Sequence, residues 1–190
     1  MTSLQHPPTG TPLDSTDHFA ILDLEPKAGL DLDRLERNYL TKSRDAHPDR
    51  NASGSGNEAT LARQAALNEA YRVLRDPWLR FAYLVELRAP GTMDATKTLD
   101  PAFLMQAMEL HEEAVEAAAD ESNETRLATL ERDTRAVIED AAARIAALLD
   151  DESEDTNADA ARKAARRLHE VRYARRRLEV LTVQSRGGDS

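Results

Sequence analysis

The chain has 190 residues, of which 41% are hydrophobic and 32% are charged, with a formal net charge of −10. This composition is typical of a soluble, helix-rich protein with one domain or two small ones. The acidic balance argues against nucleic acid as a partner, since counterion release needs a basic surface. The lack of cysteine excludes disulfides, thiolate zinc sites and thiolate-bound iron–sulfur clusters, so we expect no metal and no cofactor.

Both ends of the chain have the composition of disordered segments. Residues 1–16 mix Pro, Gly, Ser and Thr with few apolar residues, and residues 184–190 are similar. No apolar run is long enough to span a membrane, and no basic-then-apolar leader opens the chain. We therefore expect no membrane partner and a cytoplasmic location.

The first half predicts a small helical module. A short helix is expected over 17–22, a turn over 26–29, and a longer helix that begins after Asp31 as N-cap. On the longer helix, apolar residues share one face at helical spacing: Leu32, Leu35, Tyr39 and Ala46. Three arginines share the opposite face: Arg34, Arg37 and Arg44. A solvated face is the ordinary interpretation of three such arginines.

The longer helix must end at His47, because Pro48 disfavours the α conformation of the residue before it. A Ser-, Gly- and Asn-rich loop follows, and a third helix is expected from residue 57 or 58 to 75. Its buried side carries Leu67, Tyr71 and Leu74. Pro77 fits the first turn of a fourth helix, which carries several aromatic residues of the expected core.

The tripeptide His47-Pro48-Asp49 has the chemistry of a rigid contact point. Asp49 offers a carboxylate to a partner arginine, His47 titrates near neutral pH, and Pro48 limits the entropy lost on docking. An isolated tripeptide of this kind is usually a turn. A catalytic His/Asp pair is disfavoured, because the chain shows no nucleophile and no oxyanion donors beside it.

The second half predicts three longer helices after a linker over 89–99. Asp100 and Pro101 supply an N-cap and a first-turn proline to the first of them. Its core stripe is Phe103, Ala107, Leu110 and Ala114, and a second apolar set is Leu104, Met105, Met108 and Val115. Glu109 and Glu112 border the second set. Either one wide stripe buries both sets, or the second set is an exposed binding patch.

The remaining helices are expected over about 122–149 and 157–183, joined by an acidic loop. The first has a regular apolar seam that includes Thr134, Val137, Ala141 and Ile145. The last helix has its own core side, with Tyr173 turned away from it. It also carries many arginines, whose simplest role is to complement acidic residues elsewhere in the bundle.

Two stretches resemble a known family. A short helix, a helix with a basic face, His-Pro-Asp, a loop and a long helix resemble a J domain. The run Asn68-x-Ala70-Tyr71-x-x-Leu74-x-x-Pro77-x-x-Arg80-x-x-Tyr83-Leu84 looks like the form found in HscB, the J-protein of iron–sulfur cluster assembly. Ala46 departs from the family, which often has an aromatic residue there. In the second half, the segment from Phe103 to Glu113 and Val171-Arg172-Tyr173 resemble the HscB surface that binds the scaffold protein IscU.

This resemblance implies an all-α co-chaperone that is not itself an enzyme. Its J domain, residues 17–88, would be a helical hairpin with short flanking helices, and residues 100–183 would form a C-terminal three-helix bundle. The implied partner of the J domain is an HscA/DnaK-type chaperone, whose ATP hydrolysis would be stimulated through His47, Pro48, Asp49, Arg34, Arg37 and Arg44. The implied partner of the bundle is an IscU-type scaffold, bound by Leu104, Met105, Met108, Glu109, Glu112 and Tyr173.

Two other interpretations share part of this sequence evidence. A general J-domain protein that delivers other clients to a DnaK-type chaperone would share the whole first half. A structural coiled-coil protein would leave the partner ATPase unstimulated, which the intact tripeptide argues against.

Overall fold

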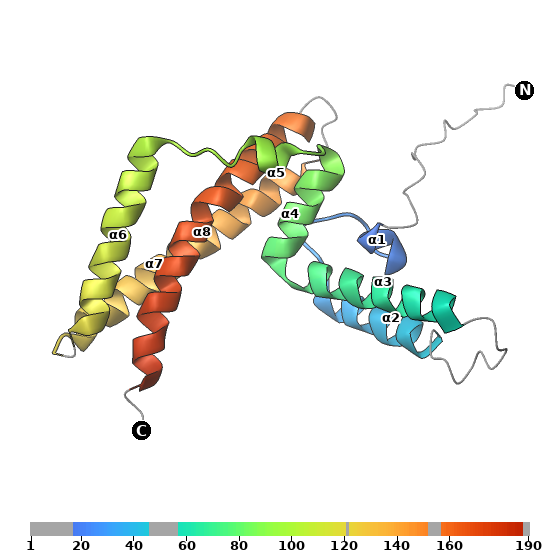
Figure 1. The fold of residues 1–190 in the computed structure, drawn as a ribbon, viewed down its shortest axis with the longest axis horizontal. Helices are drawn as coiled ribbons and strands as arrows, with labels where there is room; N and C mark the ends of the chain where they lie inside the picture. The colour runs from blue at the N-terminus through green and yellow to red at the C-terminus, as the bar shows by residue number, and fades with distance from the viewer. Residues whose placement is uncertain (1–16, 46–56, 121, 152–156, 188–190) are drawn as a thin grey trace, which may run out of the picture. The chain divides into compact units, whose positions relative to one another are not determined.

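The computed structural model describes residues 17–45, 57–120, 122–151 and 157–187, and these residues form helices joined by turns and loops (Figure 1). The all-α prediction is therefore confirmed. The helices are α1 (His18–Ile21), α2 (Leu32–Asp45), α3 (Asn57–Arg75), α4 (Pro77–Arg88), α5 (Thr92–Ala95), α6 (Pro101–Ala119), α7 (Glu124–Asp150) and α8 (Asn157–Gly187). They belong to two compact units: unit 1 contains α1–α3, and unit 2 contains α4–α8 with residues 27–29.

Unit 1 is a hairpin of α2 and α3 with α1 packed on α3. The predicted N-cap is present, because Asp31 accepts a hydrogen bond from the Arg34 amide (3.0 Å). Asp17 caps α1 in the same way and accepts from the Phe19 amide (3.1 Å). The core consists of buried apolar side chains from the three helices and from the residue that ends α1, which include Phe19, Leu22, Leu35, Leu67 and Leu74. Leu32, expected on the buried face, is 51% exposed.

A polar and aromatic seam joins α2 to α3. The rings of Tyr39 and Tyr71 stack with centroids 4.2 Å apart. The Tyr39 hydroxyl donates to the side-chain oxygen of Asn68 (3.0 Å), and Gln64 donates to Asn68 and to Ser43. Tyr71 is therefore half-buried in a ring contact, where the sequence predicted a simple core position.

His18 gives unit 1 a pH-dependent group. Burial lowers the pKa of its imidazole below 6.5, although the carboxylates of Glu69 and Asp17 act in the opposite direction. The folded unit therefore binds protons less readily than the unfolded chain, so acidification from about pH 7 to about pH 5 destabilises it. We expect an NMR titration to place the His18 midpoint below 6.5, with the signal assigned by its loss in His18→Gln. A midpoint at or above 6.5 would show that the two carboxylates outweigh burial.

Unit 2 is built around α7 and α8, which pack side by side, with α4 and α6 packed on α8 (Figure 1). The facing surfaces alternate small and large residues. On α7, Ile145 and Leu149 are fully buried. On α8, four buried alanines allow the helices to approach closely: Ala160, Ala161, Ala164 and Ala165. On α6, Asp100 caps the first turn through the Ala102 amide (2.7 Å), as predicted.

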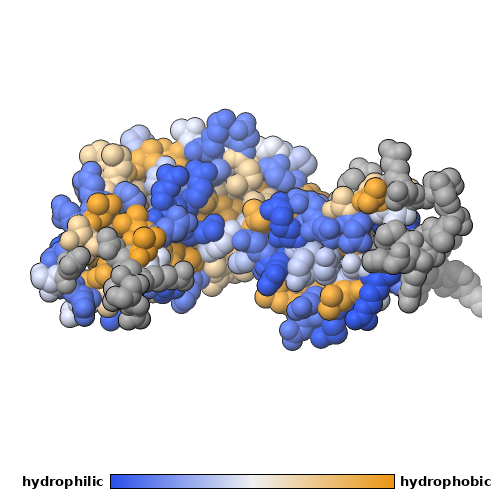
Figure 2. Space-filling view, turned by 60° about the horizontal axis from the view of Figure 1, so that its bottom comes forward, coloured by the Kyte–Doolittle hydropathy of each residue, from blue (hydrophilic) through white to orange (hydrophobic). Residues whose placement is uncertain are grey.

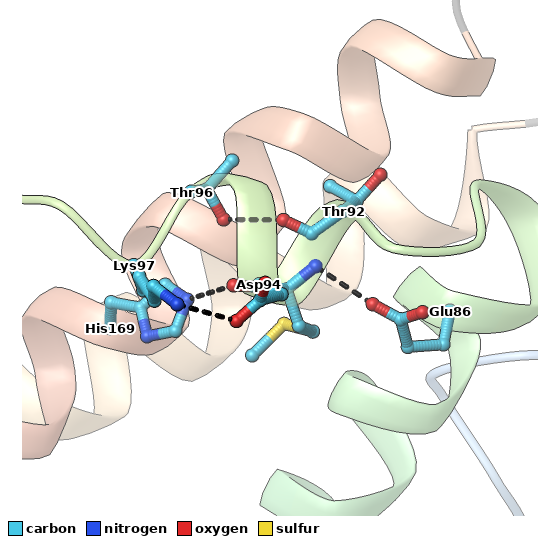
Figure 3. A network of polar contacts seen from close by, with 7 residues as sticks. Glu86, Thr92, Asp94, Thr96, Lys97 and His169 are labelled. Carbon is cyan, nitrogen blue, oxygen red and sulfur yellow. Dashed lines mark hydrogen bonds and ion pairs between the residues drawn. The ribbon is translucent and has the colours of Figure 1, made fainter.

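The expected linker over 89–99 contains the short helix α5, which polar contacts hold in place (Figure 3). The Glu86 carboxylate accepts hydrogen bonds from the amides of Gly91 and Met93, both 2.7 Å long. His169 Nε2, which is buried, donates to the Met93 carbonyl (2.8 Å). Gly91 has φ +79°, a left-handed conformation that favours glycine.

Two boundaries differ from the predicted ones. α8 continues to Gly187, four residues beyond the predicted end at 183, because Gln184, Ser185 and Arg186 are compatible with a helix and the first glycine comes at 187. α4 packs on α7 and α8 and belongs to unit 2, so the end of the J domain at residue 88 stays a prediction. The predicted disordered lead, residues 1–16, lies outside the described residues.

Residues 27–29 are held within unit 2 by two charged side chains. The Asp150 carboxylate accepts hydrogen bonds from the amides of Ala28 (2.6 Å) and Gly29 (2.9 Å). Arg80, which is buried, donates from Nε to the Ala28 carbonyl (3.0 Å). Both polar groups of the Ala28 peptide are thus satisfied by side chains from helices α7 and α4.

Replacing Arg80 by methionine is expected to destabilise unit 2 by about 2–3 kcal/mol, because the buried Ala28 carbonyl loses a charged donor. The chain has a single tryptophan, Trp78, which lies in unit 2 and reports its unfolding by fluorescence in a urea titration. Arg166→Met, at an exposed position, is the control and should change stability by less than about 0.5 kcal/mol. Equal midpoints for the two variants would show that Arg80 contributes nothing to stability.

Candidate functional site

The basic face predicted on α2 is present. The side chains of Arg34, Arg37 and Arg44 are exposed, and none of them forms an ion pair within the described residues. Lys42 on the same helix does form one, with Asp23 at 2.7 Å. With no ionic partner among the described residues, the three guanidinium groups are suited to meet an acidic surface. His47, Pro48 and Asp49 lie outside the described residues, so their placement stays a prediction.

The second apolar set on α6 faces solvent. Met105 is 64% exposed and Met108 60% exposed, while Leu104 is half-buried. Glu109 and Glu112 are exposed beside them and form no ion pair within the described residues. Figure 2 shows that hydrophobic patches lie beside hydrophilic surface on the face in view. The α6 set is thus an apolar patch with an acidic border, which is typical of protein-binding surfaces.

The expected core stripe of α6 is only partly buried. Ala114 is fully buried, but Phe103 and Ala107 are half-buried and Leu110 is 39% exposed. A groove of about 260 Å³ runs beside these residues between α6, α7 and α8. Val137, predicted as part of the α7 seam, lines this groove and is 51% exposed. In the first half of α6, neither apolar set is therefore fully buried. The second half packs on the bundle through three buried alanines, Ala114, Ala117 and Ala118.

Tyr173 connects α8 to α6. Its ring meets that of Phe103 edge to face, with centroids 5.8 Å apart and an interplanar angle of 84°. Tyr173 is half-buried and also lines the groove. Phe103 directly precedes Leu104 and Met105 on α6. The ring contact therefore brings Tyr173 next to α6, the helix that carries the other predicted scaffold-binding residues.

The arginines of α8 differ in their surroundings. Arg177 donates from Nε to Thr134 Oγ1 (3.0 Å), and burial lowers the pKa of its guanidinium, although the nearby Glu113 carboxylate acts in the opposite direction. Arg175 lies over the ring of Trp78, 5.0 Å from its centroid. Arg172 and Arg176 are exposed and form no ion pair within the described residues.

The described residues contain no group of three or more His, Asp or Glu side chains that could hold a metal ion. None of the described helices is long and apolar enough to cross a membrane.

Comparison with family models gives two matches that together span most of the chain. Residues 17–83 match the DnaJ domain, and residues 99–176 match the HSCB C-terminal oligomerisation domain. The first match includes the predicted chaperone-facing residues of α2 together with the His-Pro-Asp tripeptide. The second match includes every predicted scaffold-binding residue, from Leu104 to Tyr173.

Individual relatives agree with the family models. The chain is 38% identical over 149 residues to the co-chaperone protein HscB homolog of Paraburkholderia phymatum, covering 77% of this chain and 85% of the relative. It is 40% identical over 137 residues to that of Cupriavidus taiwanensis, covering 70% and 77%.

Solved structures have the same fold. Chaperone HscB from Vibrio cholerae superposes with a TM-score of 0.69 at 25% identity, covering 90% of this chain and 98% of that one. The crystal structure of human co-chaperone protein HscB superposes with a TM-score of 0.71 at 22% identity, covering 92% and 84%. The resemblance predicted from the sequence is therefore confirmed, and the chain belongs to the HscB family of J-domain co-chaperones.

Proposed function

We propose that the chain stimulates ATP hydrolysis by an HscA/DnaK-type chaperone and delivers an IscU-type scaffold to it during iron–sulfur cluster assembly and transfer. The observation that carries the proposal is the solvent-exposed pair Met105 and Met108, with their acidic border, in a chain that also has a DnaJ domain. A chain with both features is suited to hold a client on one unit and to engage a chaperone with the other.

In this proposal the scaffold binds first to unit 2. Met105, Met108 and Leu104 lose their contact with water on binding, which supplies most of the favourable free energy, and methionine adapts to an irregular partner surface. Glu109 and Glu112 form the polar border, and Tyr173 extends the contact to α8. The cluster belongs to the scaffold as cargo, since this chain has no cysteine to hold it.

Unit 1 then engages the chaperone. The exposed guanidinium groups of Arg34, Arg37 and Arg44 attract an acidic surface and orient the encounter, and the His47-Pro48-Asp49 tripeptide makes the contact that stimulates hydrolysis. The reaction takes place in the chaperone, so this chain supplies no catalytic residue. Because one chain binds both partners, each raises the effective concentration of the other. We place this exchange in the cytoplasm.

Single-turnover ATP hydrolysis tests the proposal. The chaperone is mixed with radiolabelled ATP alone, with this chain, with an IscU-type scaffold, and with both. We expect this chain to raise the rate and the scaffold to raise it further. A rate raised by this chain but indifferent to the scaffold would support the general-client interpretation. No acceleration with either an HscA-type or a DnaK-type chaperone would overturn the proposal.

A further inference from the structure

Arg172 and Arg176 lie one turn apart on α8, and no hydrogen bond or ion pair among the described residues gives them a structural role. Both side chains are exposed and outside any ion pair of the described residues. Some other cations of the unit are paired, for example Arg144 with Asp140 (2.7 Å) and Lys163 with Asp159 (2.7 Å). Because α8 continues to Gly187, neither arginine lies in its last turn, and interaction with the helix dipole does not explain them.

The two arginines lie beside the proposed scaffold surface. At roughly 100° per residue, both side chains leave α8 on the same side of Tyr173, about 60–100° around the helix from it. Tyr173 in turn meets Phe103 of α6. On α6, Glu109 and Glu112 are exposed and unpaired within the described residues. α8 therefore carries exposed positive charge and α6 exposed negative charge, and the two helices are in contact through the Tyr173 and Phe103 rings.

We propose that Arg172 and Arg176 bind carboxylates of the same partner that the apolar patch of α6 holds. This inference rests on the proposed function and adds the chemistry of the partner. The docking surface then has a basic side on α8 and an acidic side on α6. The partner that fits it has an apolar centre with an acidic segment on one side and basic residues on the other.

Such a surface selects one orientation of the partner. If the partner were turned around, carboxylates would face Glu109 and Glu112, and cations would face Arg172 and Arg176. Like charges placed together in this way weaken binding, so the charge pattern disfavours the reversed complex, which an apolar patch alone would tolerate. A defined orientation also presents the same face of the scaffold to the chaperone in every complex.

The first test compares two double charge reversals, R172E/R176E and R162E/R166E, in full-length chains. Arg162 and Arg166 lie on the same helix, are exposed and form no ion pair within the described residues, so both variants change the net charge equally. Binding to an apo IscU-type scaffold is measured by calorimetry at about 50 mM and about 500 mM salt. We expect R172E/R176E to raise Kd about tenfold at low salt and R162E/R166E to change it less than about twofold, with the difference shrinking at high salt.

The second test reverses both sides together in E109K/E112K/R172E/R176E, which keeps the net charge at −10. We expect this variant to bind more weakly than R172E/R176E, since both contacts are then repulsive. Three results would overturn this inference while leaving the proposed function intact. They are unchanged affinity of R172E/R176E for the scaffold, an equal loss of affinity in R162E/R166E, and wild-type affinity of the fourfold variant. Circular dichroism confirms that each variant folds. If the wild-type chain does not bind the scaffold, the proposed function fails, and the inference falls with it.

Discussion

A double variant, Met105→Ser and Met108→Ser, is expected to bind an IscU-type scaffold more than about thirtyfold more weakly than the wild-type chain. The two side chains are 64% and 60% exposed, so most of their burial happens on docking. Burying one such side chain fully contributes about 1.5–3 kcal/mol, so burying the exposed part of both contributes at least about 2 kcal/mol. The measurement is Kd by calorimetry.

The same variant should leave the fold intact, because serine at exposed positions changes stability by less than about 0.5 kcal/mol. The matched control is Leu32→Ser with Leu61→Ser, which removes comparable apolar surface from side chains 51% and 60% exposed in unit 1. We expect the control to bind the scaffold as the wild type does. An equal loss in the control would mean that general surface hydrophobicity, and not the α6 patch, holds the scaffold.

Much of the fold could be predicted because its signals are local. N-caps at Asp31 and Asp100, prolines at 77 and 101, and apolar periodicity identify where helices begin and which side they bury. The role of α5 was not predictable in this way. Its place depends on Glu86 and on His169, which is 76 residues from Met93 in the sequence, and a contact of such range leaves no local pattern.

The candidate site was predicted as a set of residues, but its exposure was not. Periodicity identified two apolar sets on α6 without showing which one the bundle would cover. In the structure the groove between α6, α7 and α8 leaves Leu110 and Val137 partly exposed, so the packing of three helices decides the outcome. Arg172 and Arg176 were missed for a similar reason. The sequence shows that α8 is rich in arginine. Only the structure shows that no carboxylate within the described residues pairs with these two.

The His47→Gln variant is expected to reduce chaperone stimulation to the unstimulated rate. His47 belongs to the segment that matches the DnaJ domain, and glutamine keeps hydrogen-bonding groups but loses the imidazole ring and its titration near neutral pH. Scaffold affinity should not change, because the residues proposed to bind the scaffold all lie in unit 2. Single-turnover hydrolysis at saturating concentrations of this chain measures the effect. Full stimulation by His47→Gln would show that the tripeptide is only a turn.

Reversal of Arg37 and Arg44 to glutamate separates attraction from stimulation within the same unit. Both side chains are exposed, and neither forms an ion pair within the described residues. Their loss should therefore raise the concentration of this chain that gives half-maximal stimulation, by about tenfold at low salt, and should leave the maximum nearly unchanged. His47→Gln should do the reverse and lower the maximum itself. If both variants lower only the maximum, the arginines are part of the stimulating contact, and long-range attraction by the basic face of α2 plays no part.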